Sequence, residues 1–366
     1  MKKYFYSIGL MSGTSIDGID LSLIKSDGEK NIEVIDNIYQ KYNNKFRQKI
    51  KKNIDLCYSK YQFTKFSKEI KAVEKDITIR HAKLCNLVKN KNKNIKIDLI
   101  GFHGQTMLHN PKKGYSIQIG DSKLLSKLTK TTVVSNFRNN DILNGGQGAP
   151  LAPLYHNLIL SNILKIIPSA IINIGGIANI TYIEKKNKII SFDTGPGNCL
   201  LDSWVKNKSK VFFDKNGNFA KKGKLNKRIL DNFFKDPYYT KKPPKSLDVK
   251  KFNLKYLENS NLEDGCATLS ALTIKSINTA VRSLKKPPKI ILFTGGGRNN
   301  KFIINKLKTL INKPIYLIDK FNFNGDFIES QAFAYLAIRS YLKKVITLPS
   351  TTGVRKPCSG GIITKY

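Results

Sequence analysis

The sequence predicts an α/β protein built from two similar halves. Apolar strand-like runs alternate with long helical patterns along the 366 residues, an arrangement typical of α/β domains. The order of strand, glycine turn and two further strands occurs near residue 4 and again near residue 169, about 165 residues later. The length also favours two domains. We therefore expect an internal duplication that is visible in topology rather than in sequence identity.

The first half opens with a hairpin. Residues Tyr4 to Leu10 form an apolar and aromatic run, and Ile19 to Ile24 alternate apolar with polar side chains. Backbone N–H groups of the glycine-rich loop between them could bind an anion, and Asp17 and Asp20 could hold a hydrated Mg²⁺. A ligand-free hairpin turn is the alternative of equal weight. The candidate anion-binding residues are Gly13, Thr14, Ser15, Ile16, Asp17, Gly18, Ile19 and Asp20.

Two further regions of the first half suggest ligand binding. After a strand at 32–39 and a helical pattern at 64–91, the buried-strand run 95–102 ends just before His103 and Gln105. Loops beyond the carboxyl ends of strands hold ligands in open α/β sheets, so both side chains are candidates. A hydrogen-bonded structural histidine is the alternative for His103.

A short strand at 131–135 leads to Arg138 and to the glycine-rich segment 145–150. An arginine buried in a cleft would bind a carboxylate or phosphate through two hydrogen bonds, whereas a surface arginine would have no such role. The glycines closed by a proline indicate a boundary or hinge. We expect an N-terminal domain at 1–135, with 345–366 returning to it, and a C-terminal domain at 136–344.

The second half repeats the opening pattern. Strands are expected at 169–174, 178–183 and 188–192, with the turn Gly175-Gly176 between the first two. Asp193 follows the third strand and begins a tight loop with Gly197 and Asn198. It faces the expected ligand edge, although an aspartate before such a turn can also serve only to cap it.

The remainder of the chain supplies a third glycine loop. Residues 206–252 have little pattern and are expected to form helix plus irregular insertion, followed by a helix at 262–284. A buried strand at 289–293 then leads into Gly295, Gly296 and Gly297, which allow close approach of a flat or anionic ligand. The last long helix, expected at 327–342, carries Glu329 in its first turn.

Composition limits the function classes. Lysine and arginine number 64 against 26 acidic residues, a net charge of +38, which invites a nucleic-acid interpretation. The lysines are scattered, however, and no basic arm or zinc-finger spacing is present. Five widely separated cysteines indicate a reducing compartment. No stretch is as apolar as a membrane helix. We expect a cytoplasmic protein without specific nucleic acid or membrane partners.

Together these motifs resemble the anhydro-N-acetylmuramic acid kinase family, within the sugar kinase, Hsp70 and actin ATPase superfamily. The resemblance covers essentially the whole chain. It rests on seven ordered motifs, which are Gly9–Asp20, Phe102–Thr106, Phe137–Leu151, Asn173–Asn179, Phe192–Asn198, Thr294–Asn300 and Glu329–Ala334.

The resemblance implies two duplicated ribonuclease-H-like α/β domains with an interdomain cleft. It also implies a cytoplasmic kinase that uses ATP and Mg²⁺ to open 1,6-anhydro-N-acetylmuramic acid hydrolytically, giving N-acetylmuramic acid 6-phosphate in peptidoglycan recycling. A homodimer is an open alternative to a monomer. Asp193 is the expected general base. The residues expected to bind ATP, together with the opening loop, are Gly175, Gly176, Asn179 and Gly295–Gly297. The residues expected to bind the sugar are His103, Gln105, Arg138, Gly197, Asn198 and Glu329.

The sequence departs from the family pattern at three internal places and in its lysine-rich C-terminal tail. Asn136 replaces a usual aspartate, Ser330 replaces a usual alanine, and Leu247-Asp248-Val249 replaces a Thr-Gly-Arg run.

Two other function classes remain. A non-catalytic ATP-binding protein would leave Arg138 and His103 without a role, and a nucleic-acid-binding protein would leave the glycine loops without one.

Overall fold

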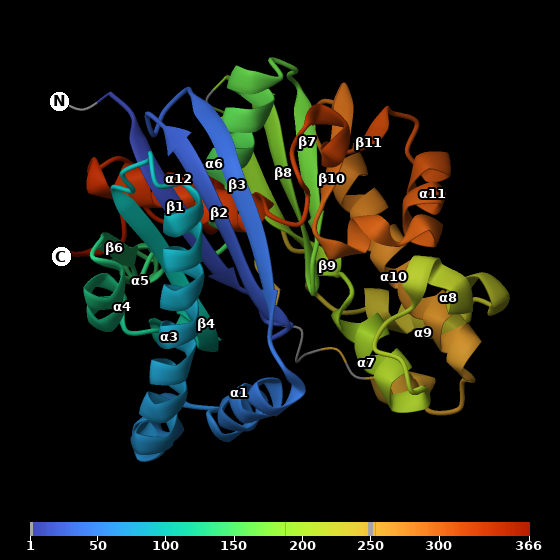
Figure 1. Cartoon of the computed structure of the whole chain (residues 1–366). Helices are drawn as coiled ribbons and strands as arrows, with labels where there is room; N and C mark the ends of the chain where they lie inside the picture. The colour runs from blue at the N-terminus through green and yellow to red at the C-terminus, as the bar shows by residue number, and fades with distance from the viewer. Residues whose placement is uncertain (1–2, 187, 248–251, 253) are drawn as a thin grey trace. The chain divides into compact units, whose positions relative to one another are not determined.

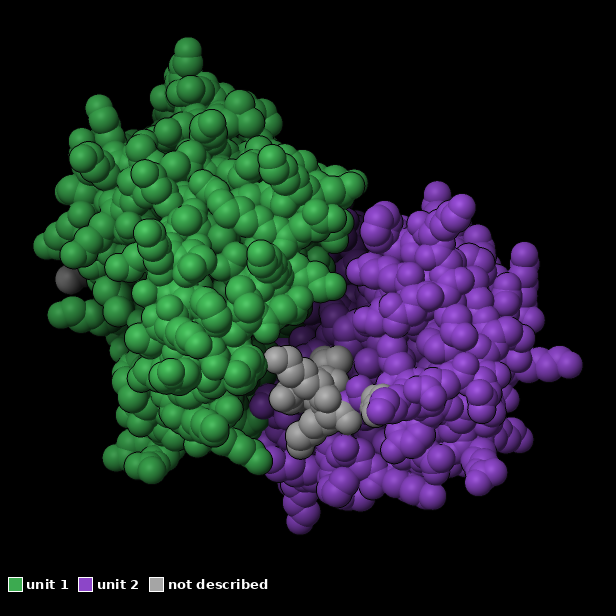
Figure 2. Space-filling model, turned by 90° about the horizontal axis from the view of Figure 1, so that it is seen from below, with its two compact units in different colours: residues 1–158, 327–366 green, residues 159–326 purple. Residues whose placement is uncertain are grey.

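The computed structural model describes residues 3–186, 188–247, 252 and 254–366. They form two compact units, unit 1 with residues 1–158 and 327–366 and unit 2 with residues 159–326 (Figure 2). The division expected from the sequence placed 136–158 and 327–344 with the second half. These residues belong to unit 1, because the last long helix packs on the strands of the first sheet.

Unit 1 contains a seven-stranded mixed sheet in the order β12-β6-β4-β1-β2-β3, with β5 attached to β4 (Figure 1). The first three strands are antiparallel, whereas β4 runs parallel to β1 and β6 parallel to β4. Strand β12 returns the end of the chain to β6. The bounds are β1 Phe5–Ser12, β2 Gly18–Ser26, β3 Ile32–Lys41, β4 Leu99–Asn110, β5 Tyr115–Ile119, β6 Thr132–Ser135 and β12 Ile362–Thr364.

Unit 2 repeats this topology in a five-stranded sheet of order β11-β10-β7-β8-β9. Its first strand, β7, lies between an antiparallel second strand and a parallel fourth strand, as β1 does in unit 1. The expected duplication of α/β halves is therefore confirmed. The bounds are β7 Ser169–Ile174, β8 Ile177–Lys185, β9 Lys188–Pro196, β10 Ile290–Thr294 and β11 Ile315–Leu317.

Helices cover the sheets. The helix expected at 64–91 is interrupted at Phe66, whose φ of −97° and ψ of 28° end one helix and begin the next. No helix among the described residues is long and apolar enough to cross a membrane. Unit 1 has α1 Asn44–Leu56, α2 Lys60–Lys65, α3 Ser67–Lys91, α4 Ser122–Thr129, α5 Asn139–Leu143, α6 Pro153–Asn157, α12 Ile328–Tyr341 and α13 Pro349–Thr352; unit 2 has α7 Cys199–Lys208, α8 Asn218–Lys222, α9 Lys227–Phe234, α10 Leu262–Arg282 and α11 Lys301–Leu310.

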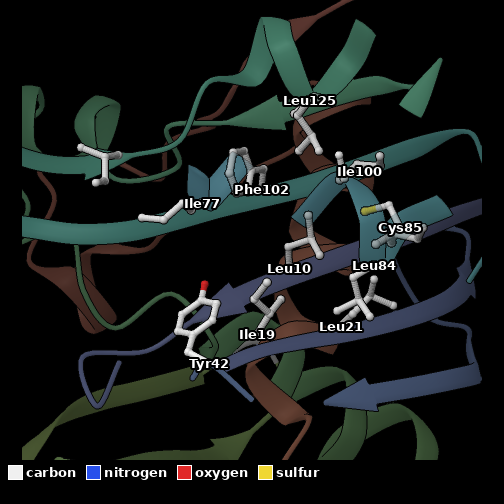
Figure 3. Close-up of a cluster of buried hydrophobic side chains, with 14 of the residues drawn as sticks. Leu10, Ile19, Leu21, Tyr42, Ile77, Leu84, Cys85, Ile100, Phe102 and Leu125 are labelled. Carbon is white, nitrogen blue, oxygen red and sulfur yellow. The ribbon is translucent and has the colours of Figure 1, made fainter. Parts of the chain in front are cut away.

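The core of unit 1 lies between α3 and one face of its sheet (Figure 3). Leu10 and Leu21 from the hairpin meet Ile77 and Leu84 from α3, all within 4% exposure. Each such side chain stabilises the fold by about 1.5–3 kcal/mol through burial. The opening loop thus emerges from well-buried strands.

The other face of the sheet is covered by α12 (Figure 1). Gly9 and Gly101 lie opposite each other in β1 and β4. A Cβ added to Gly9 would lie 1.9 Å from Ser330 O, and one on Gly101 would lie 2.3 Å from Phe333 O. Both glycines are therefore required for the helix to rest directly on the strands.

Strand β4 extends further than the sequence indicated. It continues to Asn110, because β5 pairs with its second part as a hairpin. His103 and Gln105 therefore lie inside a strand and not in the loop expected after residue 102. The apolar run covers only the first part of a strand that stays largely buried as far as Leu108.

Buried histidines make the fold sensitive to acid. Burial lowers the pKa of His81 to about 4 and that of His156 to about 3. An unfolded histidine binds a proton near pH 6.5, whereas these stay neutral in the fold. The stability they contribute is therefore complete above about pH 6.5 and is lost as the pH falls toward their folded values.

We expect His81→Leu to weaken this pH dependence. Removing one such histidine should lower the slope of the unfolding free energy by about 1.4 kcal/mol per pH unit between pH 6 and about 4. Urea denaturation at several pH values measures this slope. Leu84→Ala, a core variant on the same helix without a titratable group, should lower stability equally at each pH. An unchanged slope in His81→Leu would contradict the burial effect.

Candidate functional site

The opening loop between β1 and β2 is held by side chains from beneath it. The Ser12 hydroxyl lies 3.1 Å from Gly18 O and 3.0 Å from Gln105 Oε1, and Gln105 Nε2 donates to Gly13 O at 3.2 Å. Gln105 is fully buried. The structure thus assigns its amide to shaping the loop, a role that the sequence did not indicate.

The outer part of the loop is open to solvent. Thr14 and Ser15 are exposed, and Ile16 adopts a left-handed conformation with a φ of 55°. Its carbonyl accepts a hydrogen bond from Arg47 Nε at 2.9 Å. Ser15 Oγ donates to Asp17 Oδ1 at 2.7 Å. Hydroxyls and backbone groups are therefore fixed in position around an accessible turn.

Two carboxylates accompany this loop. Burial, followed by the charges of Asp17 and Asp20, raises the pKa of Tyr39 to about 12. Burial is also the main cause that raises the pKa of Tyr42, and the same two charges add to it. Both carboxylates therefore lie near the same tyrosines. Among the described residues no three His, Cys, Asp or Glu side chains gather as a metal site. The pair Asp17 and Asp20 fits Mg²⁺, which binds one or two carboxylates together with waters and phosphates.

In unit 2 three glycine loops meet. Asn198 N donates to Gly175 O at 2.8 Å, and Gly197 N donates to Gly176 O at 3.0 Å. A Cβ on Gly197 would lie 2.3 Å from Gly175 O, and one on Gly297 would lie 2.2 Å from Ile174 Cγ2. The turn after β7, the loop after β9 and the loop after β10 are thus in direct contact.

The triple-glycine loop is supported by a buried arginine. Arg298 Nε and Nη2 donate to Asp319 at 2.9 and 3.0 Å, and Nη1 donates to Asp326 at 2.5 Å and to Gly295 O at 3.1 Å. Such multiple charge-assisted bonds fix the orientation of the loop. The sequence shows Arg298 directly after the glycines, but its two acidic partners lie too far along the chain to be recognised.

Asp193 belongs to a polar row across the second sheet. Asn179 on β8 lies directly opposite Asn173 on β7 and Asp193 on β9. The sequence placed Asp193 in a loop after the strand, but β9 continues to Pro196 because these residues still pair with β8. Asp193 is 8% exposed. Its position is therefore held by pairing within a strand.

A segment of the poorly patterned insertion closes on Asp193. Leu247 N donates to Asp193 Oδ2 at 2.8 Å, Asp193 N donates to Lys245 O at 3.0 Å, and the Tyr238 hydroxyl donates to Asp193 O. Burial lowers the pKa of Lys245, whose ammonium donates to Tyr238 O at 3.0 Å. Tyr238 and Lys245 were missed, because nothing in the insertion links them to Asp193. Asp248 and Val249 lie outside the described residues.

In unit 1, His103 and Arg138 form a second polar group. Arg138 Nε and Nη2 donate to His103 Nε2 at 3.1 and 2.9 Å, and the other ring nitrogen lies 2.7 Å from Gly104 O. Burial and the Arg138 charge keep the pKa of His103 well below its usual value. The ring is therefore neutral with its proton on Nδ1. Glu329 is near enough for Arg138 to lower its pKa, although burial raises it overall.

The glycine-rich segment 145–148 is fixed inside unit 1. Asp141, 1% exposed, accepts from Gly148 N at 2.6 Å and from the Thr352 hydroxyl at 2.5 Å. Arg138 Nη1 donates to Gly148 O at 2.6 Å. The units divide between residues 158 and 159, so the glycine segment is a hydrogen-bonded loop within unit 1 and not the boundary between units. A hinge at these glycines stays a prediction.

Two departures from the family pattern fit their surroundings. Asn136 has a φ of 56°, a left-handed conformation that asparagine adopts more readily than most residues. Ser330 Oγ lies 2.6 Å from Ser22 Oγ and donates to Phe327 O at 2.9 Å. The backbone conformation therefore suits Asn136, and the Ser330 hydroxyl has hydrogen-bond partners.

Three glycines have no structural requirement for the absence of a side chain. A Cβ would meet only Ser15 Oγ at 3.6 Å on Gly13, only atoms at 3.5 Å or beyond on Gly175, and nothing within 4 Å on Gly296. Their φ angles are also accessible to other residues. Each lies in one of the three loops predicted to contact a ligand, so the space beside them is available to a bound molecule.

The family profile and the curated relatives point to the same family over nearly the whole chain. The family profile described as anhydro-N-acetylmuramic acid kinase matches residues 5–366. Among curated relatives, the anhydro-N-acetylmuramic acid kinase of Pelagibacter ubique is 44% identical and covers 100% of both chains. That of Zymomonas mobilis is 38% identical and covers 98% of this chain and 99% of its own.

Similarity to solved structures is lower. A ROK family glucokinase from Streptomyces griseus, in complex with glucose and AMPPNP, covers 91% of this chain and 99% of its own with a TM-score of 0.41 and 10% identity. An inorganic polyphosphate/ATP-glucomannokinase from Arthrobacter has a TM-score of 0.42, with 10% identity over 91% of this chain and 98% of its own.

Proposed function

Because the chain belongs to the anhydro-N-acetylmuramic acid kinase family, we propose how its own residues carry out that reaction. The enzyme opens 1,6-anhydro-N-acetylmuramic acid hydrolytically and phosphorylates it at the expense of ATP, giving N-acetylmuramic acid 6-phosphate and ADP in cell-wall recycling. The five cysteines are all free, which supports action in the reducing cytoplasm.

The observation that best supports nucleotide binding is the room beside Gly13, Gly175 and Gly296. In unit 1 we assign residues Gly13–Asp20 to the phosphates of ATP, with Asp17 and Asp20 toward Mg²⁺. In unit 2 we assign Gly175, Gly176, Asn179 and Gly295–Gly297 to ATP. Bound Mg²⁺ would neutralise phosphate charge during transfer. Backbone donors need close approach, which a side chain on these glycines would prevent.

Asp193 is assigned as the general base. It removes a proton from a water that attacks the anomeric carbon, and the bond from that carbon to the bridging oxygen breaks. The released oxygen takes the γ-phosphoryl group, and ADP leaves. Leu247 N and the strand pairing of β9 orient the carboxylate for this step.

The sugar is assigned to His103, Arg138, Gly197, Asn198 and Glu329. Gln105 was also expected at the sugar. Because its amide bonds to Gly13 of the opening loop, we propose that it acts on the sugar only indirectly, through the shape of that loop. The neutral His103 ring accepts from Arg138 and so fixes the direction of the guanidinium. A guanidinium held in this way suits the carboxylate of a muramic acid.

Incubation with ATP, Mg²⁺ and 1,6-anhydro-N-acetylmuramic acid tests the proposal. Mass spectrometry should show a product heavier than the sugar by the elements of phosphate plus water. Omitting the sugar should leave ATP largely intact. ATP binding without sugar-dependent turnover would instead indicate the non-catalytic ATP-binding class of the actin or chaperone type.

Arg138→Lys should raise the KM for the sugar by about 10-fold or more, because lysine cannot form the two bonds to His103 that aim the guanidinium. The KM for ATP should stay within a few-fold. Steady-state kinetics measure both values. Arg339→Lys, which alters another partly buried arginine of unit 1, is the matched control. Equal effects of the two variants on the sugar KM would exclude a direct role for Arg138.

A further inference from the structure

An exposed apolar run stands out in unit 2. Val211, Phe212 and Phe213 are 47%, 59% and 56% exposed, and they are consecutive in the connection that follows α7. A buried cluster that includes Trp204 and Ala220 lies on either side of the run in the sequence, yet it does not enclose these side chains. Consecutive large apolar side chains in water are a mark of an interaction surface.

The loop that presents them is well anchored at both ends. Ser209 Oγ donates to Val205 O at 2.7 Å and accepts from Val211 N at 3.3 Å. At the other end Asp214, 4% exposed, accepts from the backbone N–H groups of Phe219 and Ala220 at 2.8 and 3.0 Å. The apolar tip is therefore held outward by its own base.

Basic residues flank the tip in the sequence, and Asp264 of α10 accepts a hydrogen bond from Lys224 N at 2.6 Å. Nine of the 23 residues 206–228 are lysine or arginine, against 64 of 366 in the whole chain, and the one acid among them is the buried Asp214. All nine basic side chains are exposed. Within the described part of the chain, none of the nine forms an ion pair. The Lys206 charge acts against the rise in the pKa of Asp202 that burial causes, and Lys208 Nζ lies 5.0 Å from the centroid of the Trp204 ring. The charge of the other seven is available to an acidic partner.

We propose that residues 206–228 dock the protein on an anionic lipid bilayer, with Val211, Phe212 and Phe213 entering the interface. Exposed aromatic side chains beside a basic cluster combine the two attractions, apolar burial and charge, that hold a protein at such a surface. A second copy of this chain fits poorly, because it would bring the same positive segment to the contact. This inference concerns a surface that has no part in the proposed catalytic assignments, and it replaces the expectation from the sequence that the protein has no membrane partner.

Sedimentation with vesicles tests the proposal. The wild type should sediment with vesicles containing phosphatidylglycerol and much less with pure phosphatidylcholine, and salt near 1 M should weaken the binding. Phe212→Ser/Phe213→Ser should lower the partition coefficient by about 10-fold or more. Its kinase activity in solution should equal that of the wild type, which separates this inference from the function.

The matched control is Tyr58→Ser/Tyr61→Ser, which removes two aromatic side chains that are 70% and 71% exposed on unit 1. It should bind vesicles as the wild type does. The proposal is overturned by absence of wild-type binding to anionic vesicles, by equal loss in both double variants, or by full binding of the phenylalanine variant. Tight Phe212-dependent binding to single-stranded RNA without vesicle binding, or Phe212-dependent self-association without it, would also overturn it.

Discussion

Asp193→Asn should lower kcat by about 10²–10⁴-fold while ATP affinity stays within a few-fold, because a positioned general base contributes on that order. The amide can still accept the hydrogen bond from Leu247 N, so the geometry of β9 should persist. It cannot take a proton from water. Steady-state turnover at saturating sugar, with calorimetry for ATP, measures both effects.

Asp214→Asn provides the control for this variant. It also changes a buried carboxylate of unit 2 that accepts backbone N–H bonds, but it lies outside the assigned site. It should reduce stability and leave kcat near that of the wild type. Near-normal turnover in Asp193→Asn would rule out Asp193 as the base and leave the structural role of capping the turn.

Gly13→Val should abolish measurable ATP binding without unfolding the protein. The added Cβ has room in the unliganded loop, where its neighbour is Ser15 Oγ at 3.6 Å. The branched side chain would occupy the space in which backbone donors meet phosphate. Calorimetric titration with ATP measures the loss, and circular dichroism and thermal unfolding confirm that the variant is folded.

Gly9→Val separates ligand effects from folding effects. Its Cβ would overlap Ser330 O of α12 at 1.9 Å, so this variant should be strongly destabilised whether or not ATP is present. A folded Gly13→Val protein with unchanged ATP affinity would mean that the opening loop is only a hairpin turn.

The sequence was sufficient for elements whose pattern is local. The opening hairpin, the strand at 169–174 and the helix at 262–282 follow from periodicity, and the glycine loops follow from residue type. Strand ends were harder. β4 and β9 continue through polar residues because a neighbouring strand pairs with them, and pairing over long separations leaves no periodic signal at the strand end.

The supporting residues of the site were beyond sequence reasoning for the same reason. Arg298 and Lys245 look like two among many basic residues until the fold brings Asp319, Asp326 and Asp193 to them. Gln105 was expected to contact the sugar, and the contacts of its amide with Ser12 and Gly13 were not expected, because a strand residue can face either side of a sheet. Motifs thus locate a site, whereas partners distant in sequence determine its geometry.

The seat of α12 on Gly9 and Gly101 has a consequence for biosynthesis. The ribosome delivers β1 and β4 first and α12 only after all of unit 2, so the helix-binding face of the first sheet stays uncovered through most of translation. Unit 2 is contiguous in sequence and can complete its core before α12 is available to cover β1 and β4. The order of folding then inverts the order of synthesis, and the nascent first sheet is the segment with the greatest need of chaperone protection.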